Sequence, residues 1–125
     1  MVRARYLPWM VMLIVLLLGA CNTHTERPPE PEKVIKSGKQ LYLEFCAECH
    51  QVDGTGWSDL YPRLAGNPIV TLHDPEPIID TVTYGQGSMM GFHDKLTSEK
   101  IAAILSYIRN AWGNQAPAVS FRQVH

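Results

Sequence analysis

The alternation of apolar and polar positions predicts a strongly amphipathic helix over residues 98–112. Apolar side chains recur there at steps of one, three and four residues, as a single buried helix face requires. They are Ile101, Ile104, Leu105, Ile108 and Trp112. Thr97 is a suitable N-cap for this helix, and Gly113-Asn114 is expected to end it.

A second helix is predicted over residues 34–47, where no proline interrupts the pattern. Its apolar positions at helical spacings are Val34, Leu41, Tyr42 and Phe45. Gly38 lies inside this helix, where glycine costs about 1 kcal/mol relative to alanine. A glycine at such a position indicates that another backbone approaches closely there.

The rest of the chain predicts one short helix and loops. Residues 76–84 form the short helix, with apolar side chains at Ile78, Ile79 and Val82. Turn-forming residues follow one another in Asp53-Gly54-Thr55-Gly56 and Gly66-Asn67-Pro68, and Gly85-Gln86-Gly87-Ser88 is expected to be a flexible loop. Because no alternating strand pattern of useful length is present, the predicted fold class is all-α.

Residues 1–20 have the pattern of a secretory signal peptide. Arg3 and Arg5 precede an unbroken apolar run of ten residues, Trp9 to Leu18. A membrane-spanning helix needs about 20 such residues, so this run has the length of a signal-peptide core instead. The following Leu18-Gly19-Ala20-Cys21 resembles the bacterial lipobox, which predicts lipidation of Cys21 as the new N-terminus. The alternatives are an ordinary signal peptide with a chance cysteine, or an uncleaved anchor.

The remaining chain divides into a linker, one domain and a tail. Residues 22–33 contain three prolines and almost no apolar side chain, so they cannot bury enough surface to order themselves. We therefore expect the lipidated cysteine and a flexible linker over residues 21–33. One folded domain is expected over residues 34–117, with a C-terminal tail over residues 118–125.

Composition excludes several classes of function. The chain has 125 residues and a formal net charge of −1, without the basic stripe that a nucleic-acid-binding protein normally shows. Its three cysteines are too few for a disulfide scaffold. Export would place them in an oxidising compartment, where a pair of thiols persists only if something occupies it.

The sequence Cys46-Ala47-Glu48-Cys49-His50 carries the chemistry. A redox dithiol would need a strand-to-helix context, which the predicted helices do not provide. A zinc site would need two further clustered ligands, and His73 and His93 are isolated in sequence. C-x-x-C-H is the signature of covalent haem attachment. In that interpretation Cys46 and Cys49 form thioether bonds to the porphyrin, and His50 is an axial ligand of the iron.

A methionine is the usual second axial ligand in electron-transfer haem proteins. Outside the predicted signal peptide the chain has two, Met89 and Met90, and both lie in the glycine-rich segment before the last helix. Either one suits this role by its position in the chain.

With these motifs the chain resembles the small bacterial class I cytochromes c, the monohaem type found beside membrane dehydrogenases and oxidases. The resemblance covers about residues 37–125. Besides C-x-x-C-H it rests on Tyr61-Pro62-Arg63-Leu64-Ala65-Gly66-Asn67-Pro68, on Gly85-Gln86-Gly87-Ser88-Met89-Met90-Gly91-Phe92, and on Leu96-Thr97 leading into residues 103–109. It implies a cytochrome c fold in which the N- and C-terminal helices cross, near Gly38 and Tyr107, and loops enclose the haem.

The resemblance also assigns roles to single residues. Where the family usually has Met-Pro-x-Phe, this chain has Met89-Met90-Gly91-Phe92, so the distal ligand is Met89. The carbonyl oxygen of Pro62 is expected to accept a hydrogen bond from the Nδ1–H group of His50, and Leu64 is expected to pack on the porphyrin.

The function that follows is single-electron transfer by one covalently bound haem c with His50 and Met89 as axial ligands. We expect a carrier, not an enzyme, tethered by lipid to the periplasmic face of a bacterial membrane. Its expected partners are redox complexes of a respiratory or photosynthetic chain or a dehydrogenase, with neither nucleic acid nor a small-molecule substrate. The first alternative is a permanently bound cytochrome c subunit of a membrane dehydrogenase or terminal oxidase. A haem-based gas sensor or peroxidase and a thiol oxidoreductase are further alternatives.

Overall fold

A computed structural model of the chain describes residues 31–57 and 59–125. The predicted signal peptide, Cys21 and most of the predicted linker lie outside the described residues. Within those two ranges, every helix is too short or too polar to cross a lipid bilayer.

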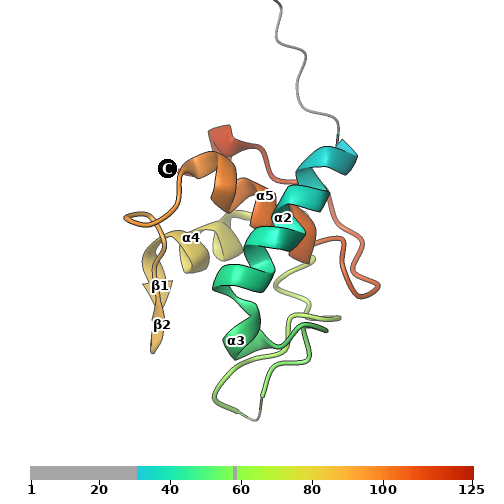
Figure 1. The fold of residues 1–125 in the computed structure, drawn as a ribbon, viewed down its shortest axis with the longest axis vertical. Coiled ribbons are helices and arrows are strands. Elements are labelled where there is room, and N and C mark those ends of the chain that lie inside the picture. Colours follow the sequence, from blue (N-terminus) through green and yellow to red (C-terminus); the bar gives the residue numbers. More distant parts are fainter. Residues whose placement is uncertain (1–30, 58) are drawn as a thin grey trace, which may run out of the picture.

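Two helices cross at the centre of the fold, α2 (Pro31–Phe45) and α5 (Ser98–Ile108) (Figure 1). The crossing lies at Gly38, which is buried against the backbone of Ala103, as the sequence predicted. Helix α2 begins three residues before the predicted start and takes in the end of the predicted linker. Proline suits the first turn of a helix, because its missing N–H group would have no partner there.

Helix α5 begins at Ser98 after Thr97, as predicted, but ends at Ile108 and not at residue 112. The side-chain amide of Asn114 donates a hydrogen bond to the carbonyl oxygen of Ile108 at 2.7 Å, in place of a backbone N–H group of a further turn. Trp112 then adopts a left-handed conformation with φ of 55°. Its ring packs edge-on against Tyr42 and Tyr107, with centroids 5.1 and 5.5 Å apart.

The short helix α4 (Glu76–Tyr84) has the predicted bounds and leads into a hairpin. Its strands β1 (Gly85–Gln86) and β2 (Met89–Met90) are antiparallel, with Gln86 opposite Met89. The sequence predicted a loop without strands here, and the structure shows this short hairpin instead. Gly85 and Gly87 have φ of 87° and 59°, values that glycine adopts without steric penalty and that allow a tight turn.

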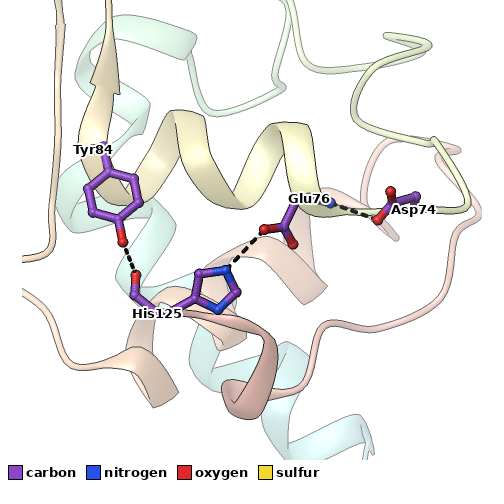
Figure 2. A network of polar contacts seen from close by, with 4 residues as sticks. All are labelled: Asp74, Glu76, Tyr84 and His125. Carbon is purple, nitrogen blue, oxygen red and sulfur yellow. Dashed lines mark hydrogen bonds and ion pairs between the residues drawn. The ribbon is translucent and has the colours of Figure 1, made fainter.

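The C-terminal segment is part of the packed domain, contrary to the expectation of a tail. Val119 and Val124 are buried in the core, on either side of a short 3₁₀ helix, η1 (Phe121–Gln123). Figure 2 shows how the segment is attached to α4. The Tyr84 hydroxyl donates to the carbonyl oxygen of His125 at 2.5 Å, and the His125 ring lies 3.0 Å from the Glu76 carboxylate.

Candidate cofactor site

The C-x-x-C-H motif follows α2 directly and forms a helical turn of its own, α3 (Ala47–His50). The backbone N–H group of His50 donates to the carbonyl oxygen of Cys46 at 2.9 Å. Cys46 and Cys49 are both free and half-buried. Burial, and next the charge of Cys49, raises the pKa of the Cys46 thiol to about 12.

The imidazole of His50 is buried and has one defined hydrogen bond. Its Nδ1 atom lies 2.9 Å from the carbonyl oxygen of Pro62, the partner predicted from the sequence. A carbonyl oxygen only accepts hydrogen bonds, so Nδ1 carries the proton and Nε2 keeps its lone pair. This is the tautomer that a metal-ligating histidine requires, with its second nitrogen oriented by a backbone carbonyl.

The loop after the motif holds Pro62 in place. The N–H group of Gly56 donates to the carbonyl oxygen of His50 at 3.0 Å, and the N–H group of Leu64 donates to that of Gly54 at 2.7 Å. Gly56 has φ of 69°, and a Cβ atom there would overlap the carbonyl oxygen of Tyr61. Glycine at this position therefore lets the loop lie directly against the backbone that carries the Pro62 carbonyl.

A cavity of about 190 Å³ brings most of the predicted site residues together. Its walls include Cys46, His50, Pro62, Leu64 and Met89. The aliphatic side chains that line the rest of it are Ile69, Val70, Ile78, Val82, Ile104 and Ile108. Cys49 is half-buried in the same turn but does not line the cavity.

This cavity fits the chemistry of a haem. Mostly aliphatic walls suit a flat apolar macrocycle, and the one histidine and one thioether on them are the donors of His/Met ligation. His73 and His93 do not line the cavity; His93 contacts the carbonyl oxygen of Thr83 and the carboxylate of Asp94 instead. In the part of the chain that the structure describes, no three histidine, cysteine or carboxylate side chains are grouped to hold a metal ion.

The hairpin separates the two methionines. Successive residues of a strand point to opposite faces, so the side chains of Met89 and Met90 diverge. Met89 is half-buried and lines the cavity, whereas Met90 is 59% exposed and its sulfur lies 3.2 Å from the Lys95 ammonium. Position in the chain suited either methionine and the resemblance favoured Met89; the hairpin places Met89, and not Met90, on the cavity wall.

Two residues that support the cavity wall were missed by the sequence analysis, Arg109 and Asn114. Arg109 is completely buried, and its guanidinium group donates to the carbonyl oxygens of Val70, Leu72 and Pro117 at 2.8–2.9 Å. Burial lowers the pKa of this arginine. The sequence pattern gives no sign of this role, because the acceptors are backbone carbonyls, two of them 37 and 39 positions away in the chain.

Comparison with known proteins identifies the family of the chain. Residues 33–108 match the family described as cytochrome C oxidase, cbb3-type, subunit III. The chain is 36% identical over 92 residues to the cytochrome c subunit of alcohol dehydrogenase (quinone) from Gluconobacter oxydans, covering 65% of this chain and 19% of that protein. It is 31% identical over 116 residues to the fructose dehydrogenase cytochrome subunit of Gluconobacter japonicus, covering 82% and 24%.

A third relative is of similar size to this chain. Cytochrome c-552 of Thermus thermophilus is 32% identical over 99 residues, which cover 68% of this chain and 75% of that protein. The chain thus spans about a fifth of the dehydrogenase subunits but most of a small cytochrome c. The predicted all-α fold with crossing terminal helices is confirmed, and the chain belongs to the cytochrome c family described as cbb3-type cytochrome C oxidase subunit III, whose cofactor is haem c.

Proposed function

We propose that this chain transfers single electrons through one haem c, bound covalently by Cys46 and Cys49, with His50 and Met89 as axial ligands. When bound, haem c supplies a one-electron couple at its iron. His50 offers Nε2 because the Pro62 carbonyl holds the proton on Nδ1. Met89 offers a neutral sulfur, and Leu64 with the aliphatic walls keeps water away from both donors.

The observation that carries this proposal is the common cavity of His50 and Met89. The two side chains come from α3 and β2, 39 positions apart in the chain, and line one space whose other walls are mostly aliphatic. A site with both axial positions filled leaves none for a substrate. We therefore propose an electron carrier without catalysis of its own, in preference to a gas sensor or peroxidase.

The test is the visible spectrum of the protein matured in a host with a cytochrome c assembly system. The proposal predicts a coloured protein whose haem stays attached after denaturation, and whose oxidised form has the weak red band of a thioether–iron bond. Met89→Ala should remove that band and allow carbon monoxide to bind. The matched control, Met90→Ala, should leave the spectrum of the parent protein. A colourless product, or loss of the band only in Met90→Ala, contradicts the proposal.

A second candidate is favoured by the names of the relatives, which are subunits of dehydrogenases and oxidases. In this alternative the same domain is permanently bound to such a membrane complex and passes its electrons within it. Copurification from native membranes in mild detergent distinguishes the two. A subunit elutes with a dehydrogenase or oxidase in constant ratio, whereas a tethered carrier elutes alone.

We also propose that Cys21 carries a lipid that holds the domain at the periplasmic face of a bacterial membrane. The support is the lipobox-like sequence before it, which lies outside the described residues. Cys21→Ser should move the haem protein from the membrane fraction to the soluble fraction of the periplasm without changing its spectrum. A variant that remains in the membrane after a salt wash would contradict the lipid anchor.

A further inference from the structure

We propose that Asn114 is a positioning residue for the haem ligand His50. It would act through the backbone turn at residues 64–66, which one residue, Arg63, separates from the Pro62 carbonyl that orients the imidazole. The inference rests on the proposed function, because the effect is measured on the bound haem. Nothing in the sequence motifs singles out Asn114 for such a role, since it lies 64 positions from His50.

The side chain of Asn114 is buried and uses all its hydrogen-bond donors. Its Oδ1 atom accepts from the N–H group of Gly66 at 2.7 Å. Its Nδ2 atom donates to the carbonyl oxygens of Leu64 at 3.1 Å and Ile108 at 2.7 Å. Exchanging the amide oxygen and nitrogen would place donors against the Gly66 N–H group, so the network itself defines the orientation of the amide.

These bonds join the end of α5 to the wall of the cavity. Ile108 is the last residue of the helix, and both it and Leu64 line the cavity. The amide of Asn114 thus connects two wall residues that are 44 positions apart. Each such bond contributes about 1 kcal/mol, so the three together are sufficient to hold one conformation of a short turn.

The turn is held on its other side by the loop that follows the C-x-x-C-H motif. Gly54 accepts from the N–H groups of Leu64 and Ala65 at 2.7 and 3.0 Å. Pro62 lies two residues before Leu64, the first residue of this doubly held turn, and a Cβ atom at Gly56 would lie 2.7 Å from its carbonyl carbon. When the Asn114 bonds are removed, the turn keeps the Gly54 bonds and the bonds from Asn67 to the carbonyl oxygens of Arg63 and Leu64, at 2.9 and 3.3 Å, but loses its link to the end of α5. The Pro62 carbonyl can then move away from the Nδ1–H group of His50.

The direction of the effect follows from the chemistry of the imidazole. A hydrogen bond from Nδ1–H to a carbonyl makes the ring a more basic ligand through Nε2. Weakening that bond makes His50 less basic and stabilises oxidised iron less. A variant that loosens the Pro62 carbonyl should therefore have a higher reduction potential than the parent protein.

The experiment compares Asn114→Ala with Asn110→Ala in the haem-containing protein. Asn110 is the control, because its Nδ2 atom also donates two hydrogen bonds to backbone carbonyl oxygens. These are the carbonyl oxygens of Ser106 and Ala116, at 3.0 Å each. Neither bond involves the turn at residues 64–66. Two quantities are measured, the reduction potential and the rate at which the Nδ1 proton of His50 exchanges with solvent in the reduced state, by nuclear magnetic resonance.

Asn114→Ala should raise the potential and speed that exchange by about tenfold, the equivalent of losing about 1.4 kcal/mol of local stability. Asn110→Ala should change neither. Equal effects in both variants, or none in Asn114→Ala, would overturn the assignment. If the parent protein shows no haem spectrum at all, the proposed function fails instead, so the two failures are distinguishable.

A measurement on the parent protein covers the case in which Asn114→Ala does not fold. Gly66 is exposed, yet its N–H group donates to the Oδ1 atom of Asn114. If Asn114 holds the turn, this amide hydrogen should exchange at least about tenfold more slowly than an unprotected one. Exchange of the Gly66 amide at the unprotected rate would show that the turn is not held, and would also overturn the assignment.

Discussion

Gly38 of α2 lies directly against the backbone carbonyl of Ala103 in α5. A Cβ atom at Gly38 would overlap that carbonyl oxygen and would lie 2.9 Å from the Cβ atom of Tyr107. The two helix backbones therefore approach as closely as they can where they cross (Figure 1). The crossing also brings Tyr42 and Tyr107 together, with ring centroids 5.5 Å apart, and Tyr42 lines the cavity.

Gly38→Ala should destabilise the protein although alanine favours a helix by about 1 kcal/mol. The added methyl group forces the helices apart, and overpacking of this kind costs about 1–3 kcal/mol or more. We expect a net loss of about 2 kcal/mol in the free energy of unfolding, measured with urea. Lys39→Ala, at the exposed neighbouring position, should change it by less than about 0.5 kcal/mol. A Gly38→Ala variant as stable as the parent protein would show that the crossing is not tightly packed.

The sequence was sufficient to predict what depends on local spacing. The close backbone approach at Gly38 was predicted from a glycine inside a helical pattern, whereas the partner of His50 was predicted from the resemblance to the class I cytochromes c. Contacts between distant residues were not predictable in this way. Arg109 bonds to carbonyls 37 and 39 positions away, and Asn114 to one 50 positions away, and a carbonyl acceptor leaves no mark on the side-chain pattern.

The misplaced end of the last helix has the same cause. The apolar spacing continues to Trp112, so the pattern predicts helix up to that residue. The side-chain amide of Asn114 instead donates a hydrogen bond to the carbonyl oxygen of Ile108. The indole of Trp112 lies beyond the end of the helix and packs against Tyr42 of α2 and Tyr107 of α5. The hairpin was missed because two strands of two residues each are too short to show an alternating pattern.

Gly56→Ala should disturb the His50 environment, and Gly66→Ala is its matched control. The two glycines have φ of 69° and 68°, so both variants incur the left-handed penalty of about 1–2 kcal/mol. A Cβ atom at Gly56 would also lie 2.7 Å from the carbonyl carbon of Pro62, whereas one at Gly66 has nothing within 4 Å. We expect Gly56→Ala to be less stable than Gly66→Ala by about 2 kcal/mol in urea unfolding. Equal stabilities would contradict the steric argument.

Arg109→Lys should destabilise the domain although it keeps the charge. The guanidinium group serves three carbonyl oxygens in fixed directions, and a lysine ammonium on a flexible chain cannot reproduce that fork. Leaving the buried carbonyl of Val70 and the part-buried carbonyls of Leu72 and Pro117 without a donor predicts a loss of about 2–4 kcal/mol in the free energy of unfolding. Arg122→Lys, at an exposed position, should change it by no more than about 0.5 kcal/mol. If the two variants lose the same stability, the three bonds of Arg109 are not structurally important.

Thr55→Val should make the domain less sensitive to acid. The Thr55 hydroxyl donates to the Asp53 carboxylate at 2.7 Å, and this bond, followed by the Thr55 backbone N–H, lowers the pKa of Asp53. A carboxylate with a lowered folded-state pKa adds stability above its unfolded pKa of about 3.9, and this stability is lost as the pH falls through the folded value. The stability difference between parent and Thr55→Val should therefore be largest near pH 6, roughly two units above the unfolded pKa, and should shrink as the pH falls through the lowered folded-state pKa of Asp53.

Thr71→Val is the control for this prediction, because the Thr71 hydroxyl donates to backbone carbonyls and not to a carboxylate. Its effect on the free energy of unfolding should be the same at every pH in the series. The measurement is urea unfolding of the three proteins from about pH 6 to about pH 3, across the range in which an aspartate titrates. Curves for parent and Thr55→Val that stay parallel as the pH falls would show that the Asp53–Thr55 bond does not couple this loop to protonation.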